Sequence, residues 1–587
     1  MRDNFNKKGL IPKILMILGI ILLILSTVLF FFKEDMFLYF KTIIIHFVKG
    51  FDPSAEREIY PILIFLIFQM ISLGVICLYL GVLLRKFTFK NLFEIQLPED
   101  KKFLEIGRER FFKKYLKWFY PLFLSVVVII IAIFLPVGLE KDDPYIIFRY
   151  VNNILSGQGW VYNLGEHING TTSTLNTILY VIGSFFYKDI PLAARVINTI
   201  SLFFASYFLF LIFYNKKRIL GGIISSVFIT INPYLIQSYG LESMLYLMLM
   251  ILSLYFYEKN KLMPMGICLA LLYLTRGDGI ILAIVLYGIY SINSKKIPFK
   301  SLVLFGLILL PFLLFLYLYF GSITPNTLYA KICQGKAGYW KLNFCGGIFY
   351  EIDYYLRKDI LVLLLTVPFF FGILHLYQKR LLDISIFMWM ILYYTAYSLL
   401  NVPPYHQYYI PLFLPTGYFL GLGCEWLIFN PYLRTKLLRI ITFFLILLIV
   451  IFPLIKIDYK EYKSLPSEYY LQYREVGLWL KRNTPQNVSV AAVEIGIVGY
   501  YSQRRMVDIC GLVMPREIAY HLMKQDMTYW FYKYKPNYII FHDKESVLFK
   551  KFEKPITNLK TFKDSYVKIK EFDSPGDGKI FIYQKTS

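Results

Sequence analysis

Residues 300–320 have the sequence KSLVLFGLILLPFLLFLYLYF, in which Lys300 is the only charged residue. A helix that crosses a bilayer needs about 20 consecutive apolar residues, so this segment predicts one crossing. The sequence as a whole predicts a polytopic α-helical membrane protein with about 13 spans. The expected crossings are residues 12–32, 60–84, 118–137, 191–214, 219–235, 241–257, 262–275, 277–291, 300–320, 359–377, 382–400, 407–429 and 437–454.

The composition agrees with this class of protein. Of the 587 residues, 57% are hydrophobic and 17% are charged, and the mean hydropathy is +0.53. An average soluble protein has about 25% charged residues, so a soluble enzyme and a disordered chain are both excluded. The net charge of +24 is concentrated in short segments between apolar runs, such as 215–218, 294–296 and 378–380. This placement is typical of cytoplasmic loops, and we expect no nucleic-acid partner.

The basic residues also predict the topology. The loop at 85–117 contains ten Lys and Arg residues, so we expect it to be cytoplasmic. Counting crossings from this loop places the N-terminus inside and the C-terminal tail outside. One more apolar run, Leu175 to Tyr187, would invert every later loop if it crossed, so we interpret it as a re-entrant or juxtamembrane element. The apolar run from Ile11 is too long for a signal peptide and predicts an uncleaved signal anchor.

The chain divides into three parts. Residues 1–117 form an N-terminal extension with two extra spans and the basic cytoplasmic loop, and residues 118–454 form the membrane domain expected to be catalytic. Residues 455–587 mix charged positions with short alternating runs, which predicts an extracytoplasmic α/β domain. Its expected elements are a helix at 469–481 and strands at 488–493, 538–542 and 579–583.

The unusual polar segments all fall on the outer side of this topology. Ionisable groups at membrane depth are costly and usually mark a functional site. Their convergence on one surface predicts a membrane-embedded active site that opens outward. These segments are residues 140–145, 165–173, 240–243, 275–279, 324–331 and 403–409.

Several motifs follow one another in a fixed order within residues 118–587. The first is the Asp142-Asp143 pair after a leading span, and the others are Tyr162-Asn163-Leu164-Gly165-Glu166, Gly170-Thr171-Thr172-Ser173, Gly240-Leu241-Glu242, Thr275-Arg276-Gly277-Asp278-Gly279, Pro325-Asn326-Thr327-Leu328-Tyr329-Ala330-Lys331 and the tail segments 494–501 and 507–512. This series resembles the GT-C glycosyltransferases, and the most similar subgroup contains the mycobacterial terminal arabinofuranosyltransferases. The resemblance implies a GT-C membrane domain followed by an outer α/β domain.

The resemblance also implies a reaction. GT-C enzymes of this kind transfer a sugar from a polyprenyl-phosphate donor to a hydroxyl of a cell-envelope glycan, lipid or protein on the outer face of the cell membrane. Two alternatives stay open: a polysaccharide polymerase or ligase that uses a lipid-diphosphate donor, and a transporter or flippase. A transporter predicts charged residues in the middle of its spans and inverted repeats, whereas the carboxylates here gather near the outer ends.

Such a transfer requires a base. A carboxylate that accepts the proton of the acceptor hydroxyl contributes about 10²–10⁴-fold to the rate. The match to the family's leading Asp favours Asp142, with Asp143 as the competitor. The alternative is that Asp142 caps the helix that follows it while Asp143 is solvated.

The leaving phosphate requires positive charge from Lys, Arg or a divalent metal ion. The candidates are Arg149, Lys331 and Arg276, and Arg149 shares a face with Asp142 if the segment between them is helical. Each has an ordinary alternative: an interfacial ion pair for Arg149, snorkelling for Lys331, and pairing of Arg276 with Asp278.

Other polar residues on the outer side are candidates for substrate binding: Glu242, Asp278, His406, Tyr405, Asn326, Glu166 and His167. Glu242 also suits the start of a helix. The adjacent Glu166 and His167 make a poor chelate, so a requirement for Mg²⁺ or Mn²⁺ stays open. If the compartment is oxidising, Cys333 and Cys345 can form a disulfide that orders Lys331, and we hypothesise that they do.

Overall fold

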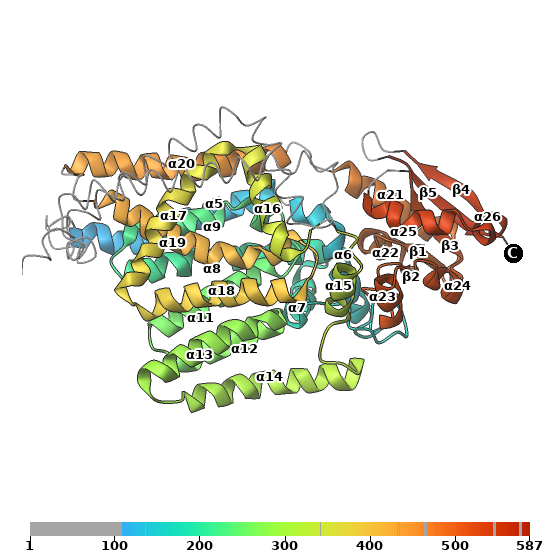
Figure 1. Cartoon of the computed structure of the whole chain (residues 1–587), viewed down its shortest axis with the longest axis horizontal. Helices are drawn as coiled ribbons and strands as arrows, with labels where there is room; N and C mark the ends of the chain where they lie inside the picture. Colours follow the sequence, from blue (N-terminus) through green and yellow to red (C-terminus); the bar gives the residue numbers. More distant parts are fainter. Residues whose placement is uncertain are drawn as a thin grey trace, which may run out of the picture.

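The computed structural model describes residues 109–135, 137–340, 342–430, 433, 435–462, 467–543, 547–573 and 578–586. The expected spans at 12–32 and 60–84 and the basic loop up to residue 108 lie outside the described residues. Within them, a bundle of apolar helices is followed by a C-terminal α/β domain at one end of the molecule (Figure 1).

Six helices in the described part are long and apolar enough to cross a membrane. They are α8 (Ile190–Asn215), η3 with α13 (Gly277–Ser294), α14 (Phe299–Phe320), η4–α17–η5 (Ile360–Gln378), α18 (Leu381–Leu400) and the Leu437–Ile457 part of α20 (Lys436–Tyr462). The chain is therefore a multi-pass helical membrane protein, and the count of thirteen spans stays a prediction.

Shorter apolar helices complete the bundle: α5 (Glu109–Phe134, apolar from Phe119), α7 (Thr174–Tyr187), α9 (Ile219–Thr230), α11 (Ser243–Glu258), α12 (Leu262–Thr275) and α19 (Phe413–Ile428). Helix α7 occupies the run that the topology left without a crossing. Its 14 residues extend about 21 Å, less than the roughly 30 Å of a bilayer core.

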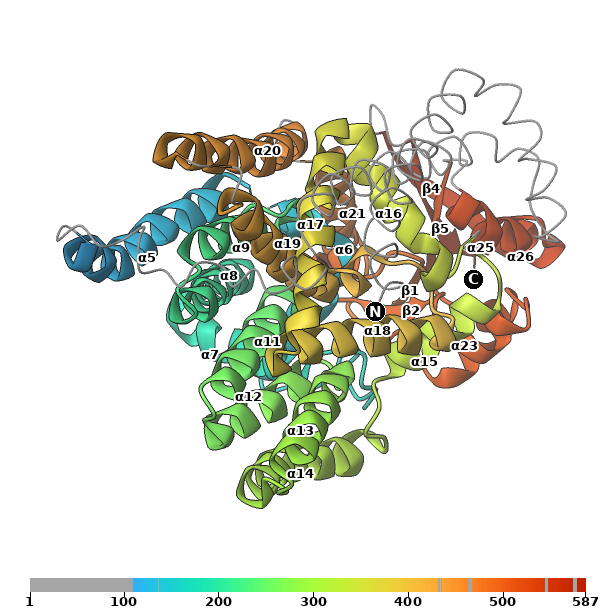
Figure 2. The ribbon, with the colours of Figure 1, turned by 60° about the vertical axis from the view of Figure 1, so that its left-hand side comes forward.

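Helices α14 and α20 lie at opposite margins of the bundle in both views (Figures 1 and 2). Only 17% of the apolar window of α14 is buried inside the protein. Its exposed side chains include Leu318 and Leu307. A helix with so much exposed apolar surface requires a lipid environment rather than water.

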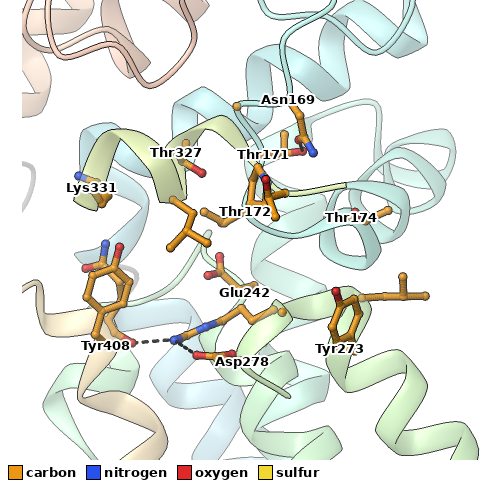
Figure 3. Close-up of a pocket in the computed structure, with 18 of the residues that line it drawn as sticks. Asn169, Thr171, Thr172, Thr174, Glu242, Tyr273, Asp278, Thr327, Lys331 and Tyr408 are labelled. Carbon is orange, nitrogen blue, oxygen red and sulfur yellow. Dashed lines mark hydrogen bonds and ion pairs between the residues drawn. The ribbon is translucent and has the colours of Figure 1, made fainter. Parts of the chain in front are cut away.

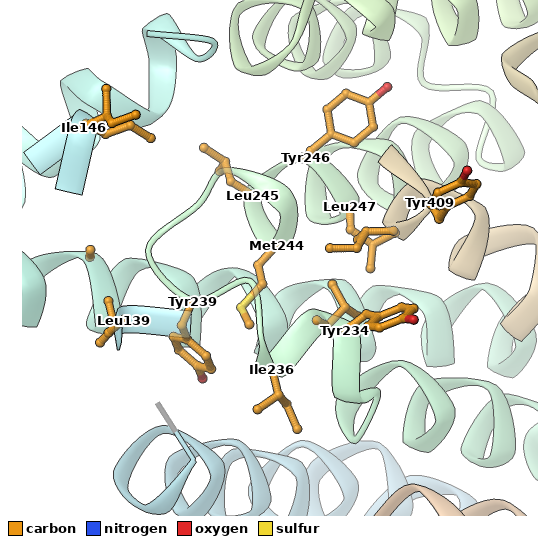
Figure 4. Close-up of a cluster of buried hydrophobic side chains, with 14 of the residues drawn as sticks. Leu139, Ile146, Tyr234, Ile236, Tyr239, Met244, Leu245, Tyr246, Leu247 and Tyr409 are labelled. Carbon is orange, nitrogen blue, oxygen red and sulfur yellow. The ribbon is translucent and has the colours of Figure 1, made fainter. Parts of the chain in front are cut away.

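Connecting segments lie between the bundle and the C-terminal domain. They include η2 (Val137–Glu140), α6 (Asp142–Leu155), α10 (Pro233–Ile236), α15 (Asn326–Lys336), α16 (Phe344–Lys358), η6 (His406–Tyr408) and η7 (Ile410–Leu412). Figure 4 shows buried side chains from Tyr234 to Leu247 between Ile146 of α6 and Tyr409. This apolar layer supports the polar segments above it.

The C-terminal domain is a five-stranded sheet with the order β2-β1-β3-β5-β4. Strands β1 (Ser489–Ala492), β2 (Arg505–Asp508) and β3 (Tyr538–His542) are parallel, and β4 (Tyr566–Phe572) and β5 (Ile580–Lys585) are antiparallel. The helices are α21 (Glu468–Asn483), α22 (Gly496–Ser502), α23 (Arg516–Met523), α24 (Tyr529–Tyr534), α25 (Val547–Thr557) and α26 (Lys560–Ser565). The three alternating runs of the sequence correspond to β1, β3 and β5.

Helix α6 attaches this domain to the bundle. The Arg149 guanidinium, 3% exposed, donates to the backbone oxygens of Gly499 at 3.1 Å and Arg504 at 2.6 Å. Its Cζ also lies 4.2 Å from the ring centroid of Tyr162. The structure therefore places Arg149 against the C-terminal domain, and it does not support the expected contact with a donor phosphate.

Two more of the expected substrate residues are also interdomain contacts. Asn326 Nδ2 donates to three backbone oxygens of the C-terminal domain, at Gly511, Leu512 and Met514. Glu166 forms an ion pair of 2.6 Å with Arg505. Asn326 thus supplies a donor to buried backbone oxygens, which require one, while Glu166 accepts from the Arg505 guanidinium.

Replacing Arg149 with Met should loosen this attachment. Two buried carbonyl oxygens lose a charged donor, which costs about 2–4 kcal/mol of stability. We expect a lower thermal unfolding midpoint in detergent and faster release of the C-terminal domain by protease. Arg482→Met, at an exposed position of α21, is the matched control. Equal midpoints and release rates in the two variants would contradict the assignment.

Candidate active site

A cavity of about 420 Å³ lies where the polar segments of the bundle meet the C-terminal domain. Its charged lining residues are Asp143, Glu242, Arg276, Asp278 and Lys331, and we name it the cation cavity after Arg276 and Lys331. Figure 3 shows Lys331 and Thr327 of α15 above Glu242, with Asp278 below. Six separate segments of the sequence therefore contribute to one cavity, as the topology predicts: 140–145, 165–173, 240–243, 275–279, 324–331 and 403–409.

Arg276 is held rigidly in this cavity. Its guanidinium donates to Asp278 Oδ2 at 2.6 Å, the Tyr397 hydroxyl at 2.7 Å and the Gln407 backbone oxygen at 3.2 Å. The pairing of Arg276 with Asp278 that the sequence left open is therefore present. Because a guanidinium stays charged at all physiological pH values, these contacts fix a permanent positive charge at the cavity wall.

Lys331 supplies the second positive charge. Its Nζ lies 3.7 Å from the ring centroid of Tyr405, a cation–π contact. The Tyr405 hydroxyl in turn donates to Gln334 on the same helix as Lys331. The aromatic ring therefore holds the ammonium group near the cavity while leaving its N–H donors available.

The two adjacent aspartates face different surroundings. Asp142, 7% exposed, accepts hydrogen bonds of 2.7 Å from the backbone N–H groups of Gly496 and Ile497. It thus caps the start of α22 in the C-terminal domain, whereas Lys141 is the N-cap residue of its own helix. Asp143 lines the cation cavity and accepts a long hydrogen bond of 3.4 Å from Gln407 Nε2. The favoured base of the sequence analysis is therefore committed to a helix, and its competitor faces the cavity.

The cap of α22 requires a glycine at position 496. A Cβ atom there would overlap the backbone oxygen of Asp142. Two N–H groups at a helix start also stabilise a carboxylate by their partial positive charge. Gly496 therefore permits the close approach on which the Asp142 contact depends.

Glu494 is a site residue that sequence reasoning set aside. With Asp142 and Asp143 it lines a second, smaller cavity of about 270 Å³, the carboxylate cavity. Burial raises the pKa of Glu494 well above its usual range, and the two neighbouring carboxylates raise it further. These shifts favour the protonated form of Glu494, which can donate a hydrogen bond to Asp142, whose own pKa burial raises to about 6.

Glu494 was missed because its segment lies in the C-terminal domain, where the sequence analysis placed no candidate catalytic or binding residue. The signal that could have identified it is its position two residues before Gly496, at the start of α22. A carboxyl group between a buried strand and a helix start lies at the edge where sites in parallel sheets form.

Other expected residues lie in different places. Glu242 lines the cation cavity as the N-cap residue of α11, but its side chain forms no cap hydrogen bond. His406 lines the carboxylate cavity and pairs with Glu351 at 2.9 Å. His167 is exposed, with its ring centroid 4.4 Å from that of Tyr319, and with Glu166 it lies outside the cavities described here. From the same segment, Thr171 and Thr172 line the cation cavity instead.

The cysteines of this region are not bonded. Cys333 is buried within α15, whereas Cys345 is exposed at the start of α16, and both thiols are free. The hypothesised disulfide is therefore not present in the structure, and Lys331 is ordered by its aromatic neighbour instead.

The carboxylates do not form a metal-binding donor set. No group of three or more His, Cys, Asp and Glu residues in the described part of the chain has the geometry to hold a metal ion. Asp142 already accepts from two backbone N–H groups and Asp278 pairs with Arg276, which leaves Asp143 and Glu242 as the other carboxyl groups of the cation cavity. The residues present therefore do not fit Mg²⁺ or Mn²⁺.

Comparison with known proteins identifies the fold. Residues 461–583 match a family model described as a domain of unknown function (DUF8728). A search of curated proteins finds no match. The archaeal oligosaccharyltransferase AglB from Archaeoglobus fulgidus, in complex with an inhibitory peptide and a dolichol-phosphate, superposes with a TM-score of 0.55 and 13% identity over 80% of this chain and 74% of that chain. ArnT from Cupriavidus metallidurans bound to undecaprenyl phosphate gives 0.53 and 10% over 80% and 98%.

The likeness to these structures shows the fold. The GT-C superfamily and the arabinofuranosyltransferase subgroup that the motifs imply both stay predictions.

The proton on Glu494 predicts a pH dependence. An ordinary glutamate in the unfolded chain titrates near pH 4.3, so above that pH the folded protein binds a proton that the unfolded chain has lost. The stability that Glu494 contributes should therefore be complete below about pH 4 and be lost as the pH rises through its folded-state pKa. We expect Glu494→Gln, which stays neutral, to flatten the fall of the unfolding midpoint between about pH 5 and about pH 8. Glu475→Gln, at an exposed site of α21, should keep the wild-type slope; identical slopes in all three proteins would refute the shared proton.

Proposed function

We propose that this chain is a GT-C type glycosyltransferase that moves a sugar from a polyprenyl-phosphate donor to a hydroxyl group on the outer face of the cell membrane. One observation supports this most strongly: Asp143 lines the same cavity as Arg276 and Lys331. A base for the acceptor and two cations for a phosphate then act on one bound donor. The solved structures with dolichol-phosphate and undecaprenyl phosphate support a lipid-phosphate donor.

The reaction forms one bond and breaks another. The acceptor oxygen attacks the anomeric carbon of the sugar as its proton passes to Asp143, and the bond from that carbon to the phosphate oxygen breaks. The electron pair of that bond leaves with the polyprenyl phosphate. Because the transition state resembles an oxocarbenium ion, the developing charge on the phosphate is the main feature to stabilise.

Arg276 and Lys331 are placed for this stabilisation. Arg276 is already fixed by its hydrogen bonds to Asp278 and Tyr397, so little reorganisation accompanies the charge change. Lys331 adds an ammonium group on α15, which the Tyr405 ring holds near the cavity. Glu242, buried in the same cavity and without a cap hydrogen bond, is proposed to bind a sugar hydroxyl.

The first test separates the two aspartates. Purified protein is assayed in detergent with a panel of radiolabelled polyprenyl-phosphate sugars and a crude envelope acceptor, with and without EDTA. We expect Asp143→Asn to lower transfer by about 10²–10⁴-fold at an unchanged unfolding midpoint. Asp142→Asn is the matched control and should lower the midpoint, because an amide NH₂ cannot accept from the N–H groups of α22. Full activity of Asp143→Asn would eliminate it as the base.

A second test concerns the donor phosphate. Lys331→Met removes a charged donor, and we expect KM for the donor to rise roughly 10- to 100-fold. Lys336→Met, on the exposed side of the same helix, controls for the charge and helix propensity of α15. A rise of equal size in both variants would assign the effect to the general field of the helix and not to contact with the phosphate.

A further inference from the structure

A third cavity of about 820 Å³ lies deeper in the helical bundle. Its walls are side chains of α16, α17, α18, α19 and α20, almost all apolar, and they include Ile352, Phe369, Met390, Phe413, Thr416 and Leu454. Three of the segments that contribute these walls are among those long and apolar enough to cross a membrane. We name it the apolar cavity. Its contents must be compatible with hydrocarbon, because polar groups lose free energy when they are buried without partners.

One end of the apolar cavity is polar. Asn232, Tyr234 and Glu351 line it there. Asn232 is fully buried, and its Nδ2 has no hydrogen-bond partner in the described part of the chain, although its Oδ1 accepts from Tyr355 and from the Tyr234 N–H. A buried amide donor at the polar end of an apolar space suits a ligand with a hydrocarbon chain and an oxygen-containing head.

The polar end leads to the proposed base. Tyr234 lines both the apolar cavity and the carboxylate cavity. Glu351 of the apolar cavity pairs with His406 of the carboxylate cavity at 2.9 Å. Asp143 then lines both the carboxylate cavity and the cation cavity. A head group that extends from the apolar cavity past this pair therefore meets Asp143.

The charged lining residues of the two cavities indicate that they bind different substrates. The cation cavity contains Arg276 and Lys331 and has its own apolar lining at Leu316, Ile323 and Leu400, which suits a prenyl phosphate. No Lys or Arg is among the described residues that line the apolar cavity. Its occupant therefore needs a hydrocarbon chain but no phosphate at that depth, which distinguishes it from the donor.

We propose that the acceptor is a membrane lipid with a hydroxylated head group, whose hydrocarbon chain occupies the apolar cavity while a head-group hydroxyl reaches Asp143. The inference rests on the proposed function and narrows it, since a glycan or protein acceptor would leave this cavity without a role. In this proposal the His406–Glu351 pair, which joins a lining residue of the carboxylate cavity to one of the apolar cavity, contacts the head group.

The test is photocrosslinking of purified protein with a diacylglycerol monohexoside that has a diazirine in one acyl chain. We expect crosslinked peptides from α16 to α19. Thr416→Phe fills the cavity and should lower the crosslinking yield there roughly tenfold. Thr442→Phe is a matched control, because both threonine hydroxyls donate to the backbone oxygen four residues earlier, at 2.8 Å, and Thr442 on α20 does not line the cavity.

Two results would overturn the inference. Equal crosslinking in Thr416→Phe and Thr442→Phe would place the lipid elsewhere, and loss of the crosslinks on addition of excess undecaprenyl phosphate would assign the cavity to the donor chain.

A transfer assay separates this inference from the proposed function. Labelled product that extracts into chloroform–methanol supports the lipid acceptor. Label that enters only water-soluble glycan or protein refutes the lipid acceptor but agrees with the proposed transferase function. Crosslinks within the apolar cavity, combined with no transfer from any polyprenyl-phosphate sugar, would instead refute the proposed transferase function and keep the lipid site.

Discussion

The arrangement of the site depends on one buried charge. A carboxylate removed from water is stable only when donors surround it. Asp142 finds its donors in the first N–H groups of α22, which lie more than 350 positions later in the chain. That contact fixes the C-terminal domain above the bundle, together with the bonds of Arg149 on the same helix. It also determines which aspartate remains for chemistry, because adjacent residues point in different directions and only Asp143 is left to face the cavity.

The bound domain contributes to the electrostatics as well as to the shape of the site. Three carboxyl groups near one another cannot all ionise at low cost, and the one with the highest pKa keeps its proton. Here that group is Glu494 of the C-terminal domain. A proton on Glu494 reduces the negative charge beside Asp143. On its other side the cavity contains Lys331 and Arg276, which is paired with Asp278, and in the proposed function these two cations face the leaving phosphate.

Much of the architecture could be predicted from the sequence because apolar length and alternation are local signals. The expected crossing at 300–320 corresponds to α14, Phe299–Phe320, and the expected strand at 538–542 to β3, Tyr538–His542. The gathering of the polar segments also followed from the topology. Side-chain directions did not, since they depend on distant contacts. Arg149 shares a face with Asp142 as expected, and that face contacts α22. Asn326, placed in a family motif, binds backbone oxygens near residue 512.

The same reasoning explains why two acidic residues in a row are useful here. A single aspartate could either hold the C-terminal domain or face the cavity, because a carboxylate that caps a helix has no free oxygen to accept a proton at the right place. With two, the structural charge and the reactive charge are one residue apart and move together. Any shift of α22 then displaces the backbone of Asp143 as well, so the position of the proposed base is set by the docking of a domain whose own chemistry is only a proton on Glu494. A site built this way is complete only when both parts of the chain are in place.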